Sequence, residues 1–261
     1  MSITWYKNGQ VKDTTIYKYD SANYYPKVIY KKTFYENGIL KKVELYDTNG
    51  TPNGIWTKYY DNGQLNIKQE FSNTVKMESL LGMHYFRNIV GNYLSYYKNG
   101  QLRFKLAFNN GRMIDGVFYE YYENGNKKQY GEIKDGLRDG EWVELYENSN
   151  LKSKGRYFSS SYKACGRLPY TAYYEYKTGA WEYYYIDQTL MAKGVYNNEI
   201  INILNGCAGG ANVNSGALNK SWIFKDTNGA DLKMKQFIKK SLLENKEILQ
   251  TRVYRLKDFN D

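Results

Sequence analysis

The sequence predicts an all-β fold: a single-layer antiparallel ribbon of β-hairpin repeats, interrupted by loop insertions and with room for a short C-terminal capping helix. Three observations predict it. A ten-residue phrase, clearest at 56–65, keeps returning along the 261 residues. Most copies turn at Asn-Gly, the strongest short signal for a β-hairpin. Tyr is abundant (30 residues) and Pro is scarce (3 residues), which favours strands over disorder.

The phrase consists of an aromatic residue, a Tyr-Tyr pair, Asn-Gly and then Leu. Further copies begin at Tyr93, Phe118, Trp142 and Trp181, and partial copies begin at Trp5, Phe34, Leu45 and Trp222. The turn glycines Gly38 and Gly63 are 25 residues apart, as are Gly100 and Gly125. That period holds two strands and two short connections and leaves no room for a helix. With about 4.8 Å per strand, each repeat advances the sheet by about 10 Å.

Asn-Gly favours a two-residue type I′ turn, which needs positive φ at both central residues. If Asn and Gly occupy those two positions, the last Tyr of the phrase faces the following Leu across the hairpin. The expected pairs are Tyr60 with Leu65, Tyr97 with Leu102 and Tyr146 with Leu151.

Strand alternation then assigns the two faces of the ribbon. The opening aromatic and the fourth residue after it share the apolar face, giving the ladder Trp56/Tyr60, Tyr93/Tyr97, Phe118/Tyr122, Trp142/Tyr146 and Trp181/Tyr185. A single-layer sheet leaves such a ladder exposed unless something covers it.

The opposite face is expected to alternate tyrosines with basic residues. We predict that it binds a partner through the residues Tyr96, Arg103, Lys105, Tyr121, Lys128 and Lys152, helped by the loop near Cys207. Tyrosine suits a half-wet binding surface, and lysines steer an acidic partner. The partner is therefore expected to be another protein, acidic in character. The alternative is ordinary Tyr–Lys packing that keeps an open sheet soluble.

The repeat array is expected to span 1–229, with loop insertions near 72–90, 158–172 and 202–219. The C-terminal segment 230–261 has a different pattern. Its first apolar residues alternate as in a strand, at Leu232 and Met234. The next apolar residues fall at helical spacing, at Phe237, Ile238, Leu242 and Leu243. We interpret this segment as a last strand followed by a capping helix.

A net charge of +10 and a pI near 9.2 also admit an anionic partner such as nucleic acid or lipid. No arginine-rich segment or nucleic-acid motif accompanies the charge. No apolar run approaches the roughly 18 residues of a membrane span. The first residues lack the basic and apolar regions of a secretory signal, so we expect a cytoplasmic protein.

The sequence does not favour an enzyme, and no cofactor, metal or small-molecule substrate is expected. His84 is the only histidine, and Cys165 and Cys207 are the only cysteines, which is too few for a triad or structural zinc. These cysteines are either two unpaired thiols or a disulfide between two insertions. Glu120 and Glu144 could suggest a glycosidase-like pair, but they occupy one column of the repeat. The Gly-rich stretch 206–216 lacks the Gly-Lys-Ser/Thr of a phosphate loop.

The phrase aromatic-x-x-Tyr-Tyr-x-Asn-Gly-x-Leu is followed by Gly-Glu-Ile-x-x-Gly-x-x-x-Gly-x-Trp in its best copy, Gly116 to Tyr157. This pattern resembles the MORN-like repeat of the YwqK antitoxin family of bacterial proteins, a MORN-like solenoid. Weaker copies extend the resemblance from about Trp5 to Gly229. The resemblance implies a single-layer hairpin ribbon and neutralisation of a partner toxin by direct binding. It transfers no catalytic residue, and the turn glycine is missing at Ser149 and Gln188.

The leading hypothesis is therefore a non-catalytic protein-binding repeat module that resembles an antitoxin or immunity protein. One alternative is a structural component of a larger assembly or cell-envelope structure. Another is attachment to anionic lipid or nucleic acid.

Overall fold

The computed structural model describes residues 1–19, 25–72, 89–165, 169–203, 211–218, 221–234 and 236. The chain folds into two compact units. Unit 1 comprises Met1–Ile114 and Glu120–Gly125, and unit 2 comprises Asp115–Tyr119 and Asn126–Asp261. Strand β10 (Gly116–Tyr121) contributes to both.

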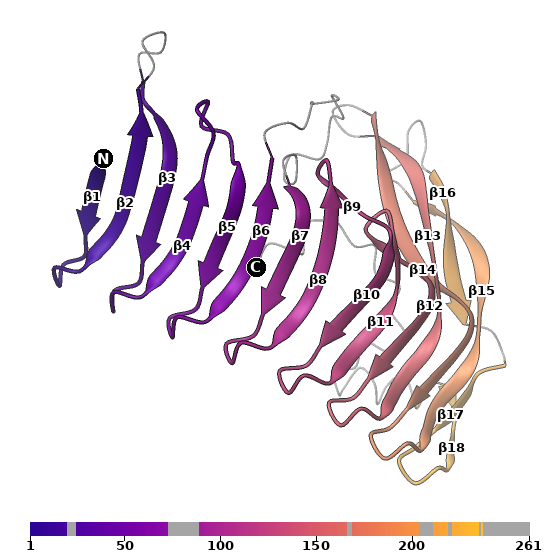
Figure 1. Cartoon of the computed structure of the whole chain (residues 1–261). Coiled ribbons are helices and arrows are strands. Elements are labelled where there is room, and N and C mark those ends of the chain that lie inside the picture. The colour runs from indigo at the N-terminus through magenta and orange to yellow at the C-terminus, as the bar shows by residue number, and fades with distance from the viewer. Residues whose placement is uncertain are drawn as a thin grey trace. The chain divides into compact units, whose positions relative to one another are not determined.

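Unit 1 is an open antiparallel sheet in which β1 to β9 pair in chain order (Figure 1). Its strands are β1 (Ser2–Trp5), β2 (Val11–Lys18), β3 (Lys27–Phe34), β4 (Leu40–Leu45), β5 (Gly54–Tyr59), β6 (Leu65–Phe71), β7 (Ile89–Tyr96), β8 (Leu102–Asn109) and β9 (Arg112–Met113). Glu120 of β10 pairs with Phe104 of β8.

Unit 2 is likewise an open antiparallel sheet. Its strands are β11 (Lys127–Lys134), β12 (Leu137–Leu145), β13 (Leu151–Cys165), β14 (Pro169–Tyr184), β15 (Leu190–Ile203), β16 (Ala211–Leu218), β17 (Ile223–Lys225) and β18 (Asp231–Leu232). Strands β11 to β16 pair in chain order, β15 also pairs with β17, and β17 pairs with β18. All named elements of the described residues are strands, so the predicted hairpin-repeat fold is confirmed. None of the described residues forms a helix of the length and hydrophobicity that crossing a membrane requires.

The hairpin turns differ from the predicted type I′ geometry. In the clearest copy, the Gly63 amide donates to the Tyr60 carbonyl oxygen at 3.0 Å, and the Tyr60 amide donates to the Gln64 carbonyl oxygen at 2.8 Å. Gly63 has φ 86°, whereas Asn62 does not have positive φ. This is the pattern of a three-residue loop with a G1 bulge. Leu65 therefore lies opposite Tyr59 and not opposite Tyr60 as predicted.

The same correction applies along the chain, where Leu102 pairs with Tyr96 and Leu151 pairs with Leu145. Where the turn glycine is missing, Ser149 (φ 68°) and Gln188 (φ 71°) adopt the left-handed conformation instead. The physical reason is that the Asn side chain bonds backbone groups from the second position of the loop: Asn62 Oδ1 accepts from the Gln64 amide, and Asn62 Nδ2 donates to the Lys98 carbonyl oxygen. The left-handed conformation is adopted by the third residue of the loop, Gly63.

A row of tyrosine hydroxyls connects successive hairpins. We call the second Tyr of each phrase the clasp tyrosine. Its hydroxyl donates to a backbone carbonyl oxygen of the next hairpin, that of the residue just before the equivalent position there. The bonds of 2.7–2.9 Å run from Tyr6 to Phe34, Tyr35 to Tyr59, Tyr60 to Tyr96 and Tyr97 to Tyr121 in unit 1, and from Tyr146 to Tyr184 and Tyr185 to Lys225 in unit 2. Turn asparagines add a parallel row, as in Asn62 Nδ2 to the Lys98 carbonyl oxygen at 3.0 Å. Only tyrosine combines an apolar ring with this donor.

The tryptophans of unit 2 lie against glycines of the neighbouring strand. Each indole Nε1 also donates to the carbonyl oxygen of the residue after that glycine. The sets are Gly131, Trp142 and Glu132; Gly155, Trp181 and Arg156; and Gly194, Trp222 and Val195. A Cβ on any of these glycines would come within 2.2–2.5 Å of the indole ring. Glycine is therefore required for the indole to approach the backbone this closely.

A second set of glycines, two residues before the opening aromatic, has positive φ. These are Gly54, Gly91, Gly116, Gly140 and Gly179. The pairing of β12 shifts register at Gly140 and that of β14 shifts at Gly179, because the partner strand has fewer residues there. Such bulges bend a strand and re-aim the next side chain, which here is the aromatic residue.

The core of unit 2 is a continuous row of edge-on aromatic contacts: Trp142, Tyr157, Trp181, Tyr196 and Trp222. Successive ring centroids are 6.2, 5.1, 6.2 and 4.9 Å apart, with interplanar angles of 73–89°. Trp181 is only 2% exposed. Trp142 and Trp181 of the predicted ladder are thus buried by neighbouring rings on their own face. Their predicted partners Tyr146 and Tyr185 act as clasp tyrosines.

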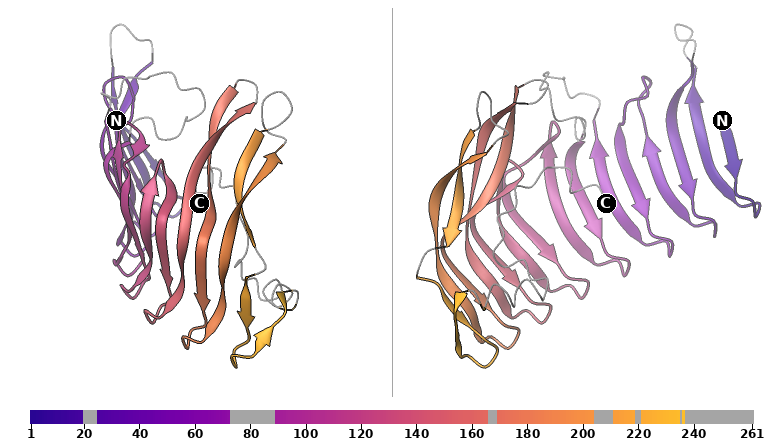
Figure 2. Two further views of the ribbon diagram at one scale, coloured as in Figure 1. Left: turned by 90° about the vertical axis from the view of Figure 1, so that its right-hand side faces the viewer. Right: turned by 180° about the vertical axis from the view of Figure 1, so that it is seen from behind.

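Two of the predicted loop insertions consist mainly of strand. Residues 158–165 extend β13 and 169–172 extend β14, while 211–218 form β16 (Figure 2). The reason is an added aromatic cluster, in which Tyr174, Tyr176 and Val213 are buried, so the extensions gain a core of their own.

The remaining predictions fall largely outside the described residues. Of the insertion near 72–90, residues 73–88 are not described, and neither are 204–210, 219–220 and the predicted helix within 237–261. The expected last strand is present as β18.

Candidate partner-binding face

The structure divides the predicted partner-binding residues between the two faces of the sheet. Tyr96 lies three residues after Tyr93 in β7, and Tyr121 lies three residues after Phe118 in β10. An odd offset along a strand places both on the face opposite the opening aromatics. Lys105 pairs with Leu94 and shares that face with Tyr96.

Arg103 lies on the aromatic face, contrary to the prediction. Tyr96 pairs with Leu102 and Ser95 pairs with Phe104, so Arg103 is the extra residue of a second bulge, which follows the G1 bulge at Gly100. Its Nε is 3.3 Å from Glu120 Oε1, and its guanidinium lies 5.9 Å from the Tyr97 ring centroid. The prediction of a two-residue turn had placed Arg103 on the face opposite the aromatic residues.

The corresponding bulge positions of the next two hairpins are Lys128 and Lys152, both in unit 2. Lys152 Nζ lies 3.2 Å from Glu144 Oε2, and Glu144 is two residues from Trp142 on the aromatic face. Lys128 is half-buried. The predicted basic residues therefore do not form one row. Glu120 and Glu144, considered above as a catalytic pair, each hold a cation.

In unit 1 the face opposite the aromatics carries a regular set of side chains, here called the tyrosine–lysine face: Tyr59, Tyr96, Tyr121, Lys68 and Lys105. Lys68 pairs with Thr57 on one side and Leu94 on the other, and Leu94 pairs with Lys105. The two lysines thus share one cross-strand row, two strands apart, or about 10 Å. Both are exposed, and among the described residues neither forms an ion pair.

The backbone beneath this face is held by the clasp. The carbonyl oxygens of Tyr59, Tyr96 and Tyr121 are the acceptors of the hydroxyls of three clasp tyrosines: Tyr35, Tyr60 and Tyr97, at 2.8, 2.8 and 2.7 Å. Each of the face tyrosines therefore stands at the same register of its hairpin on a fixed backbone. Groups ordered before binding lose less entropy when a partner arrives.

In unit 2 the equivalent tyrosine positions hold a leucine or a tyrosine that is already hydrogen-bonded, and the equivalent lysines are paired with a carboxylate. Leu145 replaces a tyrosine, and the Tyr184 hydroxyl donates to Glu182 at 2.9 Å. The lysines Lys154 and Lys193 lie 2.9 and 3.0 Å from the same carboxylate. The hydrogen bond from Lys154 lowers the pKa of Glu182 to about 2. This carboxylate therefore remains charged at neutral pH and offsets the cations around it.

The sequence prediction missed a charged group in the core of unit 2. Arg138 Nε donates to Glu175 Oε1 at 2.6 Å, and the guanidinium lies 3.9 Å from the Tyr157 ring centroid. The Arg138 amide donates to Glu175 Oε2, also at 2.6 Å. Glu175 is 7% exposed, so removing either partner would leave a buried charge. The repeat pattern did not indicate this pair, because Glu175 lies just beyond the stretch 158–172 that interrupts the repeat.

Lys177 is the second unexpected charge. Its Nζ donates to the Tyr183 hydroxyl at 2.9 Å and lies 4.5 Å from the Trp181 ring centroid. Burial lowers the pKa of Lys177 to about 8. Burial also raises the pKa of Tyr183, and it raises that of Tyr196 to about 12, so these phenols stay protonated. The lysine is an internal cation held by aromatic faces and a hydroxyl.

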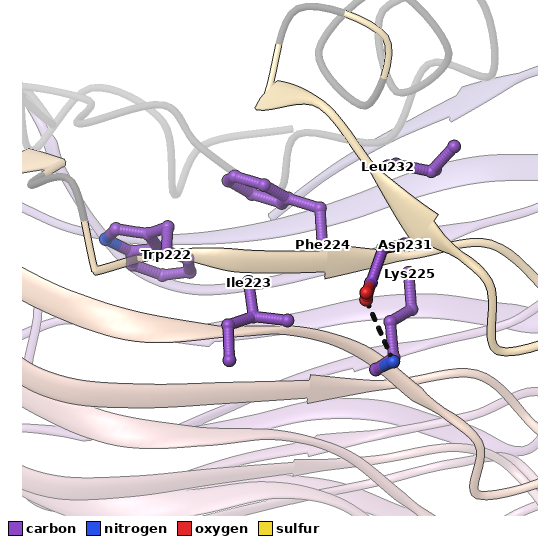
Figure 3. A pocket seen from close by; sticks show the side chains of 6 residues that line it. All are labelled: Trp222, Ile223, Phe224, Lys225, Asp231 and Leu232. Atoms are coloured by element: carbon purple, nitrogen blue, oxygen red, sulfur yellow. Dashed lines mark hydrogen bonds and ion pairs between the residues drawn. The ribbon is translucent and has the colours of Figure 1, made fainter.

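A shallow groove lies on the last hairpin of unit 2 (Figure 3). Its lining is Trp222, Ile223, Phe224, Lys225, Asp231 and Leu232. Its two charged groups are paired, with Lys225 Nζ 2.9 Å from Asp231 Oδ1. The described part of the chain contains no cluster of three potential metal ligands. His84, Cys207 and the stretch 206–210 lie outside the described residues, and so does any pairing of Cys165 with Cys207.

Four hairpin segments match the MORN repeat variant. The matched residues are 52–73, 89–110, 114–135 and 138–158. The first and second contain the strands β5–β6 and β7–β8, which carry Tyr59, Tyr96, Lys68 and Lys105.

No curated protein matches the sequence. Among solved structures, the crystal structure of TcdB2-TccC3 matches at 12% identity with a TM-score of 0.17, covering 88% of this chain and 15% of that one. That of TcdB2-TccC3-Cdc42 matches at 11% identity with a TM-score of 0.16, covering 87% of this chain and 14% of that one. The chain thus spans about 15% of the length of these proteins. TM-scores this low do not support a shared fold.

Proposed function

We propose that this protein is a non-catalytic binding module that holds an acidic partner protein on the tyrosine–lysine face of unit 1. One observation carries the proposal. Lys68 and Lys105 are exposed in one cross-strand row without an ion pair in the described residues, beside tyrosines on clasped backbone. Exposed like charges repel one another in the free protein, and an acidic surface relieves that repulsion.

The specific role we propose is that of an antitoxin or immunity protein, which neutralises a toxin in the cytoplasm by covering it. The resemblance of the repeat to the YwqK antitoxin family supports this role. A non-catalytic mechanism is consistent with the use of Glu120 and Glu144 as partners of Arg103 and Lys152. Inhibition by coverage needs only affinity and a rigid surface.

The test compares two double charge reversals of equal net charge. Lys68→Glu with Lys105→Glu alters the tyrosine–lysine face. The matched control, Lys7→Glu with Lys58→Glu, alters an exposed turn and an exposed position that pairs with Lys42 on the aromatic face. A partner captured by co-purification with neighbouring gene products is then titrated by calorimetry, with circular dichroism as the check on folding.

We expect the face variant to lose at least about tenfold in affinity and the control to change by less than about twofold. Equal loss in both variants would show only long-range charge attraction and would contradict the proposed face. Undiminished binding by the folded face variant would also contradict it.

A further inference from the structure

We infer that the partner contacts the tyrosine–lysine face through an acidic, proline-rich segment in the polyproline II conformation. This inference rests on the proposed function and adds the chemistry of the partner. It starts from the spacing of Tyr59, Tyr96 and Tyr121. These residues occupy β5, β7 and β10, and β10 pairs with β8, so successive tyrosines lie two strands apart.

The pitch of this row discriminates between possible ligands. Two strand spacings amount to about 9.6 Å. A polyproline II helix has three residues per turn and a rise of 3.1 Å, so its pitch is about 9.3 Å. Across the two intervals of the row, the mismatch is only about 0.6 Å. An α-helix that presents every seventh residue advances about 10.5 Å, which accumulates about 1.8 Å over the same distance.

An extended β-strand fits the row less well. Its same-face residues are about 6.8 Å apart, which does not match the spacing of the tyrosines. A ligand that binds as a β-strand pairs its backbone with unpaired backbone groups of the protein. Such groups lie at the edge of a sheet and not on its face.

The lysines repeat with the tyrosines. Lys68 pairs with Thr57, two residues before Tyr59, and Lys105 pairs with Leu94, two residues before Tyr96. Each of these tyrosines therefore has a lysine at the same offset, one strand over and two residues along. A segment with one acid per three-residue turn can place a carboxylate near each lysine while its prolines pack on the rings.

The chemistry of the face fits a proline-rich ligand. Flat aromatic rings take up proline rings, and a polyproline II segment is already ordered in solution. The hydroxyls of Tyr59 and Tyr96 have no hydrogen-bond partner among the described residues, so they can donate to the carbonyl groups of the ligand, which a polyproline II backbone leaves exposed. In unit 2 the Tyr184 hydroxyl already bonds Glu182.

The test uses synthetic 12-residue peptides and the full-length protein. The probe is (Pro-Pro-Glu)4. Its controls are (Pro-Pro-Lys)4 with opposite charge, (Pro-Pro-Gly-Glu)3 with a four-residue period, and an acidic alanine-based α-helical peptide. Binding is measured by calorimetry at low salt and mapped by NMR. Tyr96→Ala is the variant of choice because its backbone carbonyl still accepts the clasp bond from Tyr60. Tyr184→Ala is the matched control in unit 2.

We expect (Pro-Pro-Glu)4 to bind at least about fivefold more tightly than every control peptide. Tyr96→Ala should weaken that binding by at least fivefold, and Tyr184→Ala should leave it unchanged. Equal binding of the four-residue-period or helical peptide would overturn the inference, as would equal binding of oligo(dT)12, because charge alone would then suffice. If a captured partner loses affinity for the Lys68/Lys105 variant while (Pro-Pro-Glu)4 neither binds nor competes, the binding face stands and the polyproline inference fails.

Discussion

Unit 1 and unit 2 use the same repeat, but they differ at one register position. In unit 2, Gly155 lies between the pairs Lys154–Glu182 and Arg156–Thr178, opposite the bulge that carries Trp181. In unit 1, Gln69 occupies the same place between the pairs Lys68–Leu94 and Glu70–Val90. The Trp181 indole lies against the backbone at Gly155 and is 2% exposed. Tyr93, which the bulge opposite Gln69 carries, is only half-buried. One side chain thus decides how deeply the aromatic packs.

The units also differ in how they treat charge. Unit 2 neutralises Lys154 and Lys193 with Glu182 and buries an Arg138–Glu175 pair in its core. Unit 1 leaves Lys68 and Lys105 exposed. Aromatic packing and ion pairs thus stabilise unit 2, whereas unit 1 leaves an accessible charged face, which is the face that we propose binds a partner.

The largest expected effect comes from breaking the glycine contact. Gly155→Ala places a Cβ 2.2 Å from Trp181 Cδ2, so the indole must leave its site. We expect a loss of about 3 kcal/mol in the free energy of unfolding, from overpacking and exposed aromatic area. Gln69→Ala at the equivalent position should cost less than about 1 kcal/mol. Urea unfolding followed by tryptophan fluorescence measures both, and equal costs would refute the comparison.

Lys177 tests the charged core of unit 2. A pKa lowered from 10.5 to about 8 favours the neutral amine by about 3 kcal/mol, and the lost cation–π contact and hydrogen bond offset about 1 kcal/mol. Lys177→Met should therefore stabilise the protein by about 2 kcal/mol at pH 7. The unfolded lysine holds its proton to about pH 10.5 while the folded one loses it near 8, so the stability of the wild type rises between these values.

The measurement is thermal unfolding of both proteins from pH 7 to 9.5. The advantage of the variant should shrink across this range. A constant difference would show that the charge of Lys177 has no influence, and a less stable variant at pH 7 would show that its contacts outweigh its burial.

The clasp should act alike in both units. Tyr60→Phe and Tyr146→Phe each remove a 2.8 Å hydrogen bond between hairpins, to Tyr96 and Tyr184 respectively. We expect each to cost about 1 kcal/mol. Hydrogen exchange of the turn amides localises the loss. A difference of more than about 1 kcal/mol between the two variants would mean that the clasp is specific to one unit.

The smallest expected effect concerns Glu182. Its lowered pKa contributes stability that is present above about pH 4.5 and is lost as the pH falls toward about 2. Glu182→Gln should lower the melting temperature slightly at pH 7, by an amount equivalent to less than about 1 kcal/mol. The difference in melting temperature between the variant and the wild type should disappear as the pH falls from about 4.5 toward about 2. Glu123→Gln, at an exposed turn, is the control, and a gap that persists at pH 2.5 would exclude this origin.

The sequence predicted the hairpin-repeat fold because period, turn residues and strand alternation are local properties. It also predicted that Trp142 and Trp181 would lie on the apolar face, and both are buried there. It failed one step later, at the turn. Both a type I′ turn and a G1-bulge loop accept Asn-Gly, and choosing the former moved Arg103 and Lys152 to the wrong face. A shift of one residue exchanges the two faces of a strand.

By itself, the sequence determined the architecture of this protein: a repeated phrase with Tyr-Tyr and Asn-Gly specifies hairpins wherever it occurs, because turns and alternation depend on residues close in the chain. Only the tertiary structure decided which charges are available. Glu182 meets Lys154 and Lys193 across two strand pairs, and Glu175 meets Arg138 from 37 residues away. These distances along the chain are closed by packing, so the difference between a neutralised face and an exposed charged face appears only after the strands have been brought together.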